Sequence, residues 1–379
     1  MAESAAKKVL VLMGTRPEAI KLCPVVTVLK RDQSFQPVVC STGQHRAMLD
    51  QVLTLFDIKP DIDLMLMSPD QSLAELNARA MAELDQVLVE QQPACVLVQG
   101  DTTTAMVGAL AAFYRKIPVG HVEAGLRTDD IYHPFPEEVN RRIIGCMAQL
   151  HFAPTRRSVE ALLREGVKPM GVFQTGNTVV DALLWVKNRL SASLLEKYVR
   201  PGKRLVLVTA HRRESFGEPL RDLCRAFLEL IGRNPDLWLL YPVHLNPNVR
   251  RVVDEFLNGH ERIQLVDPLP YDELVSAMNA STLIMTDSGG IQEEAPSLGK
   301  PTLVLREKTE RAEAVEAGTS IVVGRDPKRI VTEAERLLND EASYRRAARQ
   351  ENPFGDGQAS ERILQRLRER FLEADGASS

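Results

Sequence analysis

The chain predicts an α/β protein made of two Rossmann-like, doubly wound parallel-sheet domains. Short apolar segments rich in β-forming residues alternate with longer amphipathic segments, and this alternation stops near the middle of the chain and then starts again. The length of 379 residues suits two domains that each bury their own core. Apolar residues make up 44% and charged residues 26%, as in ordinary globular proteins.

The first domain is predicted to span residues 1–174. Its expected strands are Val9–Met13, Val38–Ser41, Cys95–Gln99, Val119–Val122 and His151–Ala153. Each is followed by a helical pattern, which favours parallel strands covered by helices on both faces.

The second domain is predicted to span residues 175–358. Asn177–Val199 fits one or two helices, and the polar Arg200–Lys203 segment after it fits a bridge between domains. The expected strands are Leu205–Thr209, Leu237–Tyr241, Ile263–Val266, Leu283–Thr286, Pro301–Leu305 and Ile321–Val323. After a turn-rich segment, Ala359–Leu372 has the spacing of an amphipathic helix, which must dock on another part of the protein.

Composition excludes several classes of protein. The net charge of −4 comes from 51 acidic and 47 basic residues spread along the chain, so nucleic acid is not an expected partner. The cysteines are scattered and odd in number, which predicts reduced core thiols and no zinc site: Cys23, Cys40, Cys95, Cys146 and Cys224. The polar N-terminus and the lack of a long apolar run predict a cytoplasmic protein without a membrane segment.

Three acidic residues follow strands of the first domain, where open α/β sheets place their active sites. Asp101 begins a helix, Glu123 ends a strand, and Glu137 begins another helix. Taken singly, Asp101 or the threonines after it can cap a helix, and Glu137 can complement a helix dipole. Their convergence at one sheet edge favours catalytic acids and bases.

Two motifs offer cations to an anionic ligand. Gly14–Glu18 is a turn between strand and helix that contains Arg16, with Lys21 one turn further on. The dinucleotide pattern Gly-x-Gly-x-x-Gly is absent, so nicotinamide is not an expected cofactor. His211 and the two arginines after it lie at the end of the second domain's first strand.

The most informative motif is Thr286–Ala295. A strand leads through Ser288, Gly289 and Gly290 into a helix start, where backbone N–H groups and the helix dipole favour a diphosphate. Glu294 lies where it can accept hydrogen bonds from ribose hydroxyls, and Arg311 follows the next strand as a further cation. A serine nucleophile is disfavoured because no Gly-x-Ser-x-Gly elbow is present.

In this order the motifs resemble those of the non-hydrolysing UDP-N-acetylglucosamine 2-epimerases, from Val9 to Phe371. The resemblance implies a GT-B architecture in which a C-terminal helix, residues 359–379, crosses back to the first domain. It also implies a homodimer and a reaction without metal or other cofactor. Two departures from the family pattern are Ala312, where proline is common, and Leu274, where an aromatic residue is common.

The resemblance also implies residue roles. The catalytic residues would be Asp101, Glu123, Glu137 and His211. The substrate-binding residues would be Arg16, Lys21, His211, Ser288, Gly289, Gly290, Glu294 and Arg311. A second UDP-N-acetylglucosamine would act as an allosteric activator at Gln44, His45 and His244.

The expected reaction inverts C2 of UDP-N-acetylglucosamine reversibly to give UDP-N-acetylmannosamine for cell-surface polysaccharide synthesis. The C2 proton is not next to a carbonyl group, so loss of UDP to form a 2-acetamidoglucal, followed by its re-addition, is the accessible route. Three alternatives stay open at this point. They are the hydrolysing relative that releases UDP and N-acetylmannosamine, a GT-B glycosyltransferase, and a sugar-nucleotide sensor without activity.

Overall fold

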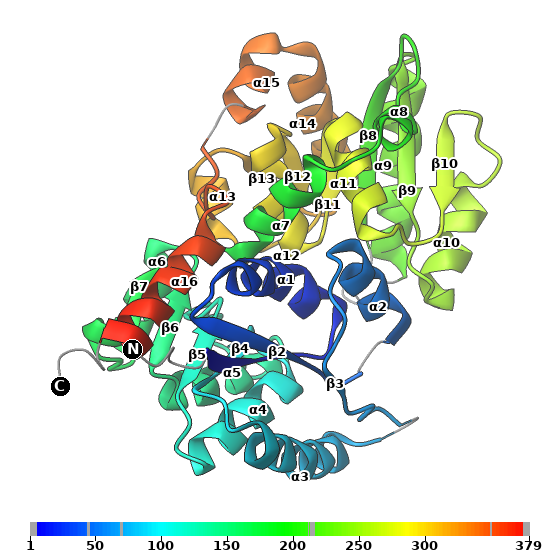
Figure 1. Ribbon diagram of the computed structural model, residues 1–379. Coiled ribbons are helices and arrows are strands. Elements are labelled where there is room, and N and C mark those ends of the chain that lie inside the picture. Colours follow the sequence, from blue (N-terminus) through cyan, green and yellow to red (C-terminus); the bar gives the residue numbers. More distant parts are fainter. Residues whose placement is uncertain are drawn as a thin grey trace. The chain divides into compact units, whose positions relative to one another are not determined.

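The computed structural model describes residues 6–43, 46–68, 71–210, 212, 217–348 and 351–373. The chain forms two compact units, coloured along the sequence in Figure 1. The first unit comprises Met1–Ala182 and Phe354–Ser379, and the second comprises Leu183–Pro353. The division falls within helix α7 (Thr178–Lys187), whereas the boundary expected from the sequence lies before this helix.

The first unit contains a seven-stranded parallel sheet with the order β3-β2-β1-β4-β5-β6-β7. The strands are β1 (Lys7–Met13), β2 (Phe35–Ser41), β3 (Ile62–Asp63), β4 (Cys95–Gln99), β5 (Val119–Val122), β6 (Leu150–Ala153) and β7 (Val172–Gln174). Every strand predicted for this domain is confirmed. Strands β3 and β7 were missed because they are short edge strands with partly buried or exposed residues, so they lack the buried apolar run that marks the other strands.

Helices cover both faces of this sheet (Figure 1). They are α1 (Arg16–Arg31), α2 (Arg46–Leu55), α3 (Leu73–Gln91), α4 (Thr103–Tyr114), α5 (Glu137–Met147) and α6 (Arg156–Arg164), with a short 3-10 turn η1 (Pro169–Gly171). On the face under α3 and α4, Leu12 and Val98 of the strands pack with Leu84 and Ala109 of the helices in one buried cluster. This burial fixes the sheet whose carboxyl edge carries the acidic residues.

The second unit contains a six-stranded parallel sheet with the order β10-β9-β8-β11-β12-β13. The strands are β8 (Arg204–Thr209), β9 (Leu237–Pro242), β10 (Ile263–Val266), β11 (Ser281–Thr286), β12 (Thr302–Val304) and β13 (Ser320–Val322). The helices are α8 (Ala192–Glu196), α9 (Glu218–Arg233), α10 (Pro247–Leu257), α11 (Tyr271–Ala280), α12 (Gly289–Glu294), α13 (Ala312–Glu316), α14 (Pro327–Asn339) and α15 (Glu341–Ala348), with a 3-10 turn η3 (Ala295–Leu298). The second Rossmann-like domain is therefore confirmed.

The end of the chain returns to the first unit. Helix α16 (Ala359–Arg368) packs against α1 and continues into the π-helical turn η4 (Glu369–Glu373). Asp181 caps the start of α16 by accepting hydrogen bonds from the backbone N–H groups of Ser360 (2.7 Å) and Ala359 (3.2 Å). Near its end Arg368 Nε donates to Asp32 Oδ2 at 2.7 Å. The return of the C-terminal helix implied by the family resemblance is confirmed.

The structure tests two predictions, one about a membrane-spanning helix and one about the burial of the cysteines. Among the described residues, no helix has both the length and the apolar character to cross a bilayer. Cys23, Cys40, Cys95 and Cys224 are buried, but Cys146 is exposed, so the prediction of core thiols is wrong for Cys146. The reason is the helical period, because Cys146 lies three residues after the half-exposed Ile143 on the outer face of α5.

Candidate active site

Two of the predicted catalytic acids follow the carboxyl ends of neighbouring strands, Asp101 after β4 and Glu123 after β5. Thr102 caps α4, since its side chain accepts a hydrogen bond from the backbone N–H of Ala105 at 3.0 Å. Asp101, one residue earlier, therefore does not serve as the cap, whereas the threonine cap that the sequence also allowed is confirmed. Its carboxylate is available for other contacts.

Asp101 is held by helix α5. The Arg141 guanidinium donates to Asp101 Oδ2 from Nη2 at 2.5 Å and from Nε at 3.1 Å, and Asn140 Nδ2 donates to the Asp101 carbonyl at 2.9 Å. Burial raises the pKa of the Asp101 carboxyl above its ordinary value, and the nearby Glu123 carboxylate raises it further, while Arg141 opposes both. Asp101 is thus a partly buried acid whose charged form is stabilised by the Arg141 guanidinium and, to a smaller extent, by Lys21.

Glu123 has a separate set of partners. Lys21 from α1 forms an ion pair with Glu123 Oε2, and Gln99 Nε2 donates to the same oxygen at 2.6 Å. The backbone of Glu123 is left-handed, with φ of 64°, which is unfavourable for a residue with a side chain. Strained backbone of this kind is found where function requires a defined side-chain direction, and here it places a carboxylate beside Asp101.

Glu137 and Glu138 differ although they are neighbours at the start of α5. Glu138 is fully engaged, because it accepts hydrogen bonds from the backbone of Thr128 (3.1 Å), from Arg141 (3.3 Å) and from Arg142 (2.9 Å). Glu137 Oε2 is buried and has no hydrogen-bond partner among the described residues. Glu138 is therefore a structural acid, and Glu137 is the one with an oxygen available for chemistry.

The Gly14–Glu18 turn was predicted to offer cations to an anionic ligand, and its backbone N–H groups are engaged within the turn itself. Glu18 Oε2 accepts hydrogen bonds from the backbone N–H groups of Gly14 (3.0 Å) and Thr15 (2.7 Å), and its Oε1 accepts one from Thr102 (2.7 Å). Burial raises the pKa of Glu18, and these hydrogen bonds lower it in part. Since these two N–H groups are already occupied, the turn can offer an anion its half-buried Arg16 side chain more readily than its backbone.

The Ser288–Gly290 turn of the second unit lies between β11 and α12. The N–H of Ser288 donates to Thr286 Oγ1 at 2.9 Å, which shapes the turn. A Cβ on Gly289 would lie 3.0 Å from Cζ of Arg311, so a side chain at this position would push the guanidinium away by a few tenths of an ångström. Arg311 is buried and donates to Glu293 (2.8 Å) and to Glu310 (2.9 Å). The predicted cation and the predicted glycines therefore form one packed cluster.

Two further predicted residues lie in the second unit. Glu294 is buried, and its Oε1 accepts a hydrogen bond from Tyr271 at 2.6 Å, which orients this carboxylate. His244 is exposed in the segment after β9, where its Nδ1 accepts from the N–H of Asn246 at 3.1 Å. His211, Gln44 and His45 lie outside the described residues, so their roles stay predictions.

Sequence reasoning missed several residues that support the site. Gln99 orients Glu123, Arg141 orients Asp101, and Glu18 orders the first turn. The only local signal was position, because Gln99 and Arg141 lie within one helical turn of predicted catalytic acids in the sequence. Among the residues that the structure describes, no group of three or more His, Cys, Asp or Glu side chains is arranged to hold a metal ion.

The two parallel sheets and the returning C-terminal helix define a protein of GT-B architecture. At the level of fold alone, a solved glycosyltransferase from Streptomyces nogalater is similar, with a TM-score of 0.64 and 16% identity over 95% of this chain and 99% of that one. Such a likeness describes architecture and leaves the reaction open.

More similar proteins define the family. The family model described as UDP-N-acetylglucosamine 2-epimerase matches residues 27–368. A UDP-N-acetylglucosamine 2-epimerase of Salmonella typhimurium is 53% identical over 369 residues, which cover 95% of this chain and 98% of the relative. The crystal structure of the UDP-GlcNAc 2-epimerase from Neisseria meningitidis bound to UDP-GlcNAc has a TM-score of 0.91 and 46% identity, covering 96% of this chain and all of that one (100%). The chain belongs to the UDP-N-acetylglucosamine 2-epimerase family.

Proposed function

We propose that this chain is a non-hydrolysing UDP-N-acetylglucosamine 2-epimerase that interconverts UDP-N-acetylglucosamine and UDP-N-acetylmannosamine. The observation that supports this most is the pairing of Asp101 with Arg141 and of Glu123 with Lys21 and Gln99 at one sheet edge. Two neighbouring carboxylates with different partners can differ in protonation state. One can then take up a proton while the other releases one. The product would serve cell-surface polysaccharide synthesis in the cytoplasm.

The proposed mechanism is an elimination followed by a re-addition. A carboxylate takes the C2 proton while the C1–oxygen bond breaks and its electron pair leaves with UDP, which gives a 2-acetamidoglucal. UDP then adds back to C1, and an acid delivers a proton to the opposite face of C2. Asp101, Glu123 and Glu137 are the proposed acids and bases, and Glu137 brings a carboxylate oxygen without a partner in the described part of the chain.

The leaving diphosphate must be stabilised and also retained for the second half of the reaction. We assign this role to Arg311 and the Ser288–Gly290 turn of the second unit, together with Arg16 and His211. Lys21 is a further proposed substrate-binding residue. A guanidinium held rigidly by Glu293 and Glu310 is preorganised, so it does not reorganise as charge develops. Glu294, oriented by Tyr271, is the proposed acceptor for ribose hydroxyls.

One experiment separates this function from its alternatives. The protein is incubated in deuterated water with UDP-N-acetylglucosamine carrying oxygen-18 at the sugar–phosphate bridge, and UDP-sugars, free sugar and UDP are resolved. Intact UDP-N-acetylmannosamine with deuterium at C2 and oxygen-18 scrambled within the diphosphate is expected. Stoichiometric free N-acetylmannosamine would favour the hydrolysing reaction, and product without deuterium or scrambling would exclude elimination.

Regulation and assembly are proposed on the family resemblance. A second UDP-N-acetylglucosamine would bind at Gln44, His45 and His244 and activate the enzyme, and the protein would be a homodimer. The exposed position of His244 is compatible with a ligand contact. Equal turnover of UDP-N-acetylmannosamine with and without a trace of UDP-N-acetylglucosamine would contradict the activation, and a monomer mass in light scattering would contradict the dimer.

A further inference from the structure

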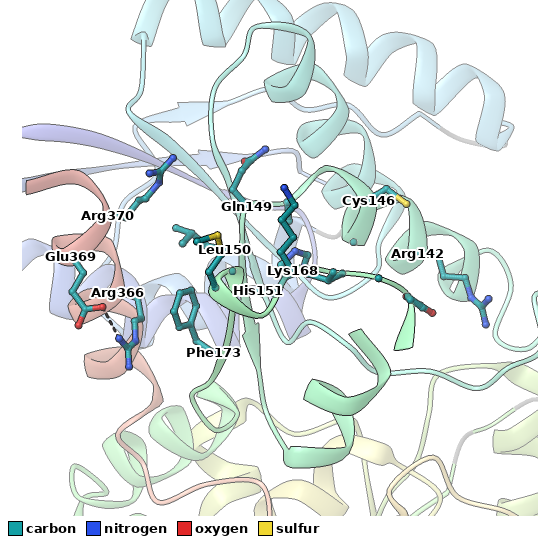
Figure 2. Close-up of a pocket in the computed structure, with 17 residues that line it drawn as sticks. Arg142, Cys146, Gln149, Leu150, His151, Lys168, Phe173, Arg366, Glu369 and Arg370 are labelled. Atoms are coloured by element: carbon teal, nitrogen blue, oxygen red, sulfur yellow. Dashed lines mark hydrogen bonds and ion pairs between the residues drawn. The ribbon is translucent and has the colours of Figure 1, made fainter. Parts of the chain in front are cut away.

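A second pocket of about 770 Å³ lies in the first unit at the amino ends of β6 and β7, away from the carboxyl edge that carries Asp101 and Glu123 (Figure 2). Its walls come from the end of α5, the start of β6, the segment between α6 and β7, and the last turns of α16 and η4. A volume of this size is within the range of small-molecule sites. None of the residues assigned to the proposed reaction lines it.

The charges that line this pocket are not balanced. Glu165 is neutralised by a forked pair of hydrogen bonds from Arg127 (2.8 and 2.6 Å), and Glu369 is paired with Arg366 at 2.6 Å. Lys168 and Arg370 have no hydrogen-bond or ion-pair partner among the described residues. Figure 2 shows Arg370 on one side of Leu150 and Lys168 on the other. The pocket therefore presents positive charge that the protein itself does not compensate.

A buried polar group in the pocket wall also lacks a partner. His151 is 1% exposed, and its Nδ1 has no hydrogen-bond partner in the described part of the chain. Burial lowers the pKa of His151 to about 4, so the ring is neutral near pH 7. In a neutral imidazole one nitrogen carries the proton and the other accepts, so Nδ1 is an acceptor in the tautomer that is protonated on Nε2. Buried acceptors without a partner are rare and call for a donor.

The backbone of the pocket wall is also unusual. Arg370 lies in η4, a π-helical turn that follows α16, and π-helical turns are rare. Leu150, Met170 and Phe173 add apolar surface between the polar groups. A ligand that suits this lining is small and negatively charged and carries hydrogen-bond donors.

We propose that this pocket is a binding site for an anionic sugar. The phosphate or carboxylate of the sugar contacts Lys168 and Arg370, and a hydroxyl group donates to His151 Nδ1. Binding is noncovalent and is independent of the proposed reaction, whose residues lie at the other edge of the sheet.

Cys146 provides a local measurement because it lines the pocket and is exposed, whereas the other cysteines are buried. The rate of Cys146 alkylation by iodoacetamide is followed by mass spectrometry on the full chain, with saturating UDP present to occupy the proposed active site. N-Acetylglucosamine 6-phosphate is the probe, and we expect it to slow the alkylation about fivefold or more at saturation. The concentration dependence of this protection gives the affinity of the probe.

Substitutions then test the named contacts. Lys168→Ala and Arg370→Ala should each weaken the affinity for the probe about tenfold, because each removes a charge-assisted hydrogen bond. Lys59→Ala is the matched control, since Lys59 is an exposed lysine of the same unit outside the pocket, and it should leave the affinity unchanged. Equal weakening by all three variants would overturn the site, because it would indicate a general charge effect.

Further probes distinguish the source of the anion and the need for a sugar. Glucuronate in place of the phosphosugar tests whether a carboxylate can replace the phosphate. Protection of Cys146 from alkylation by either compound supports the proposal. Equal protection by neutral N-acetylglucosamine, or by inorganic phosphate alone, would overturn it. A Cys146 that is not alkylated in the native protein, or whose alkylation no probe slows, would also overturn it, because the pocket would then be covered or unselective.

Discussion

The two clusters predicted to carry the reaction are built differently. In the first unit the functional groups are carboxylates, and their partners Arg141, Lys21 and Gln99 come from other elements. In the second unit the functional groups are a short turn and a guanidinium that packs directly on Gly289. Proton transfer needs acids whose pKa values are set by their surroundings, whereas holding a diphosphate needs close approach and fixed positive charge. Substitutions in the two units should therefore damage different steps.

The largest effect is expected at the acids. Asp101→Asn should lower kcat about 10²–10⁴-fold, because a general acid or base is lost, and should leave UDP affinity unchanged. Glu123→Gln and Glu137→Gln are expected to act in the same range. The measurement is steady-state turnover beside calorimetric titration with UDP, and the matched control is Asp85→Asn, whose carboxylate is paired with Arg115 at the surface. Wild-type turnover by all three variants would remove these residues from the mechanism.

The next effect concerns the partner of Asp101. Arg141→Ala removes the cation that the buried Glu138 shares with the partly buried Asp101, and should lower the free energy of unfolding by about 3–5 kcal/mol. Urea denaturation measures this change. Arg115→Ala removes an arginine from an exposed pair and should leave the unfolding midpoint nearly unchanged. If both variants unfold at the wild-type urea concentration, the buried network does not stabilise the first unit.

A smaller effect is expected at Gly289 in the second unit. Gly289→Ala places a Cβ 3.0 Å from Cζ of Arg311, so the guanidinium must shift, and UDP affinity should fall about tenfold through loss of one charge-assisted contact. Turnover at saturating substrate should fall much less. Gly232→Ala near the end of α9 is the control, because no atom lies within 4 Å of its added Cβ, and it should leave UDP binding unchanged. An unchanged UDP affinity in Gly289→Ala would separate Arg311 from diphosphate binding.

The last effect is a pH dependence of stability in the first unit. Burial lowers the pKa of His121 to about 3, so the folded protein stays unprotonated at this site while the unfolded chain takes up a proton below about pH 6.5. Stability is therefore lost as the pH falls from about 6.5 towards 3, by up to about 1.4 kcal/mol per pH unit. His121→Gln should make the free energy of unfolding between pH 6 and pH 4.5 less dependent on pH. An identical slope in wild type and variant would show that His121 is not linked to folding.

The sequence was sufficient for the fold because strands and helices have local periods. The alternation of apolar strands with amphipathic helices predicted both sheets, and only strands of two and three residues, β3 and β7, escaped it. The motifs after the strands also placed Asp101, Glu123 and Ser288 at carboxyl edges, because a parallel sheet brings these ends together.

Only the tertiary structure decided how these residues are held. Arg141 reaches Asp101 across forty positions of sequence, and Lys21 reaches Glu123 across more than a hundred, so no local pattern could join them. Local sequence also did not reveal the role of Glu18. Its carboxylate accepts hydrogen bonds from the backbone N–H groups of the turn that was predicted to bind an anion. The local sequence determines the helix, strand or turn in which a residue lies. The partners of its side chain, its burial and its pKa depend on elements that meet only when the chain has folded.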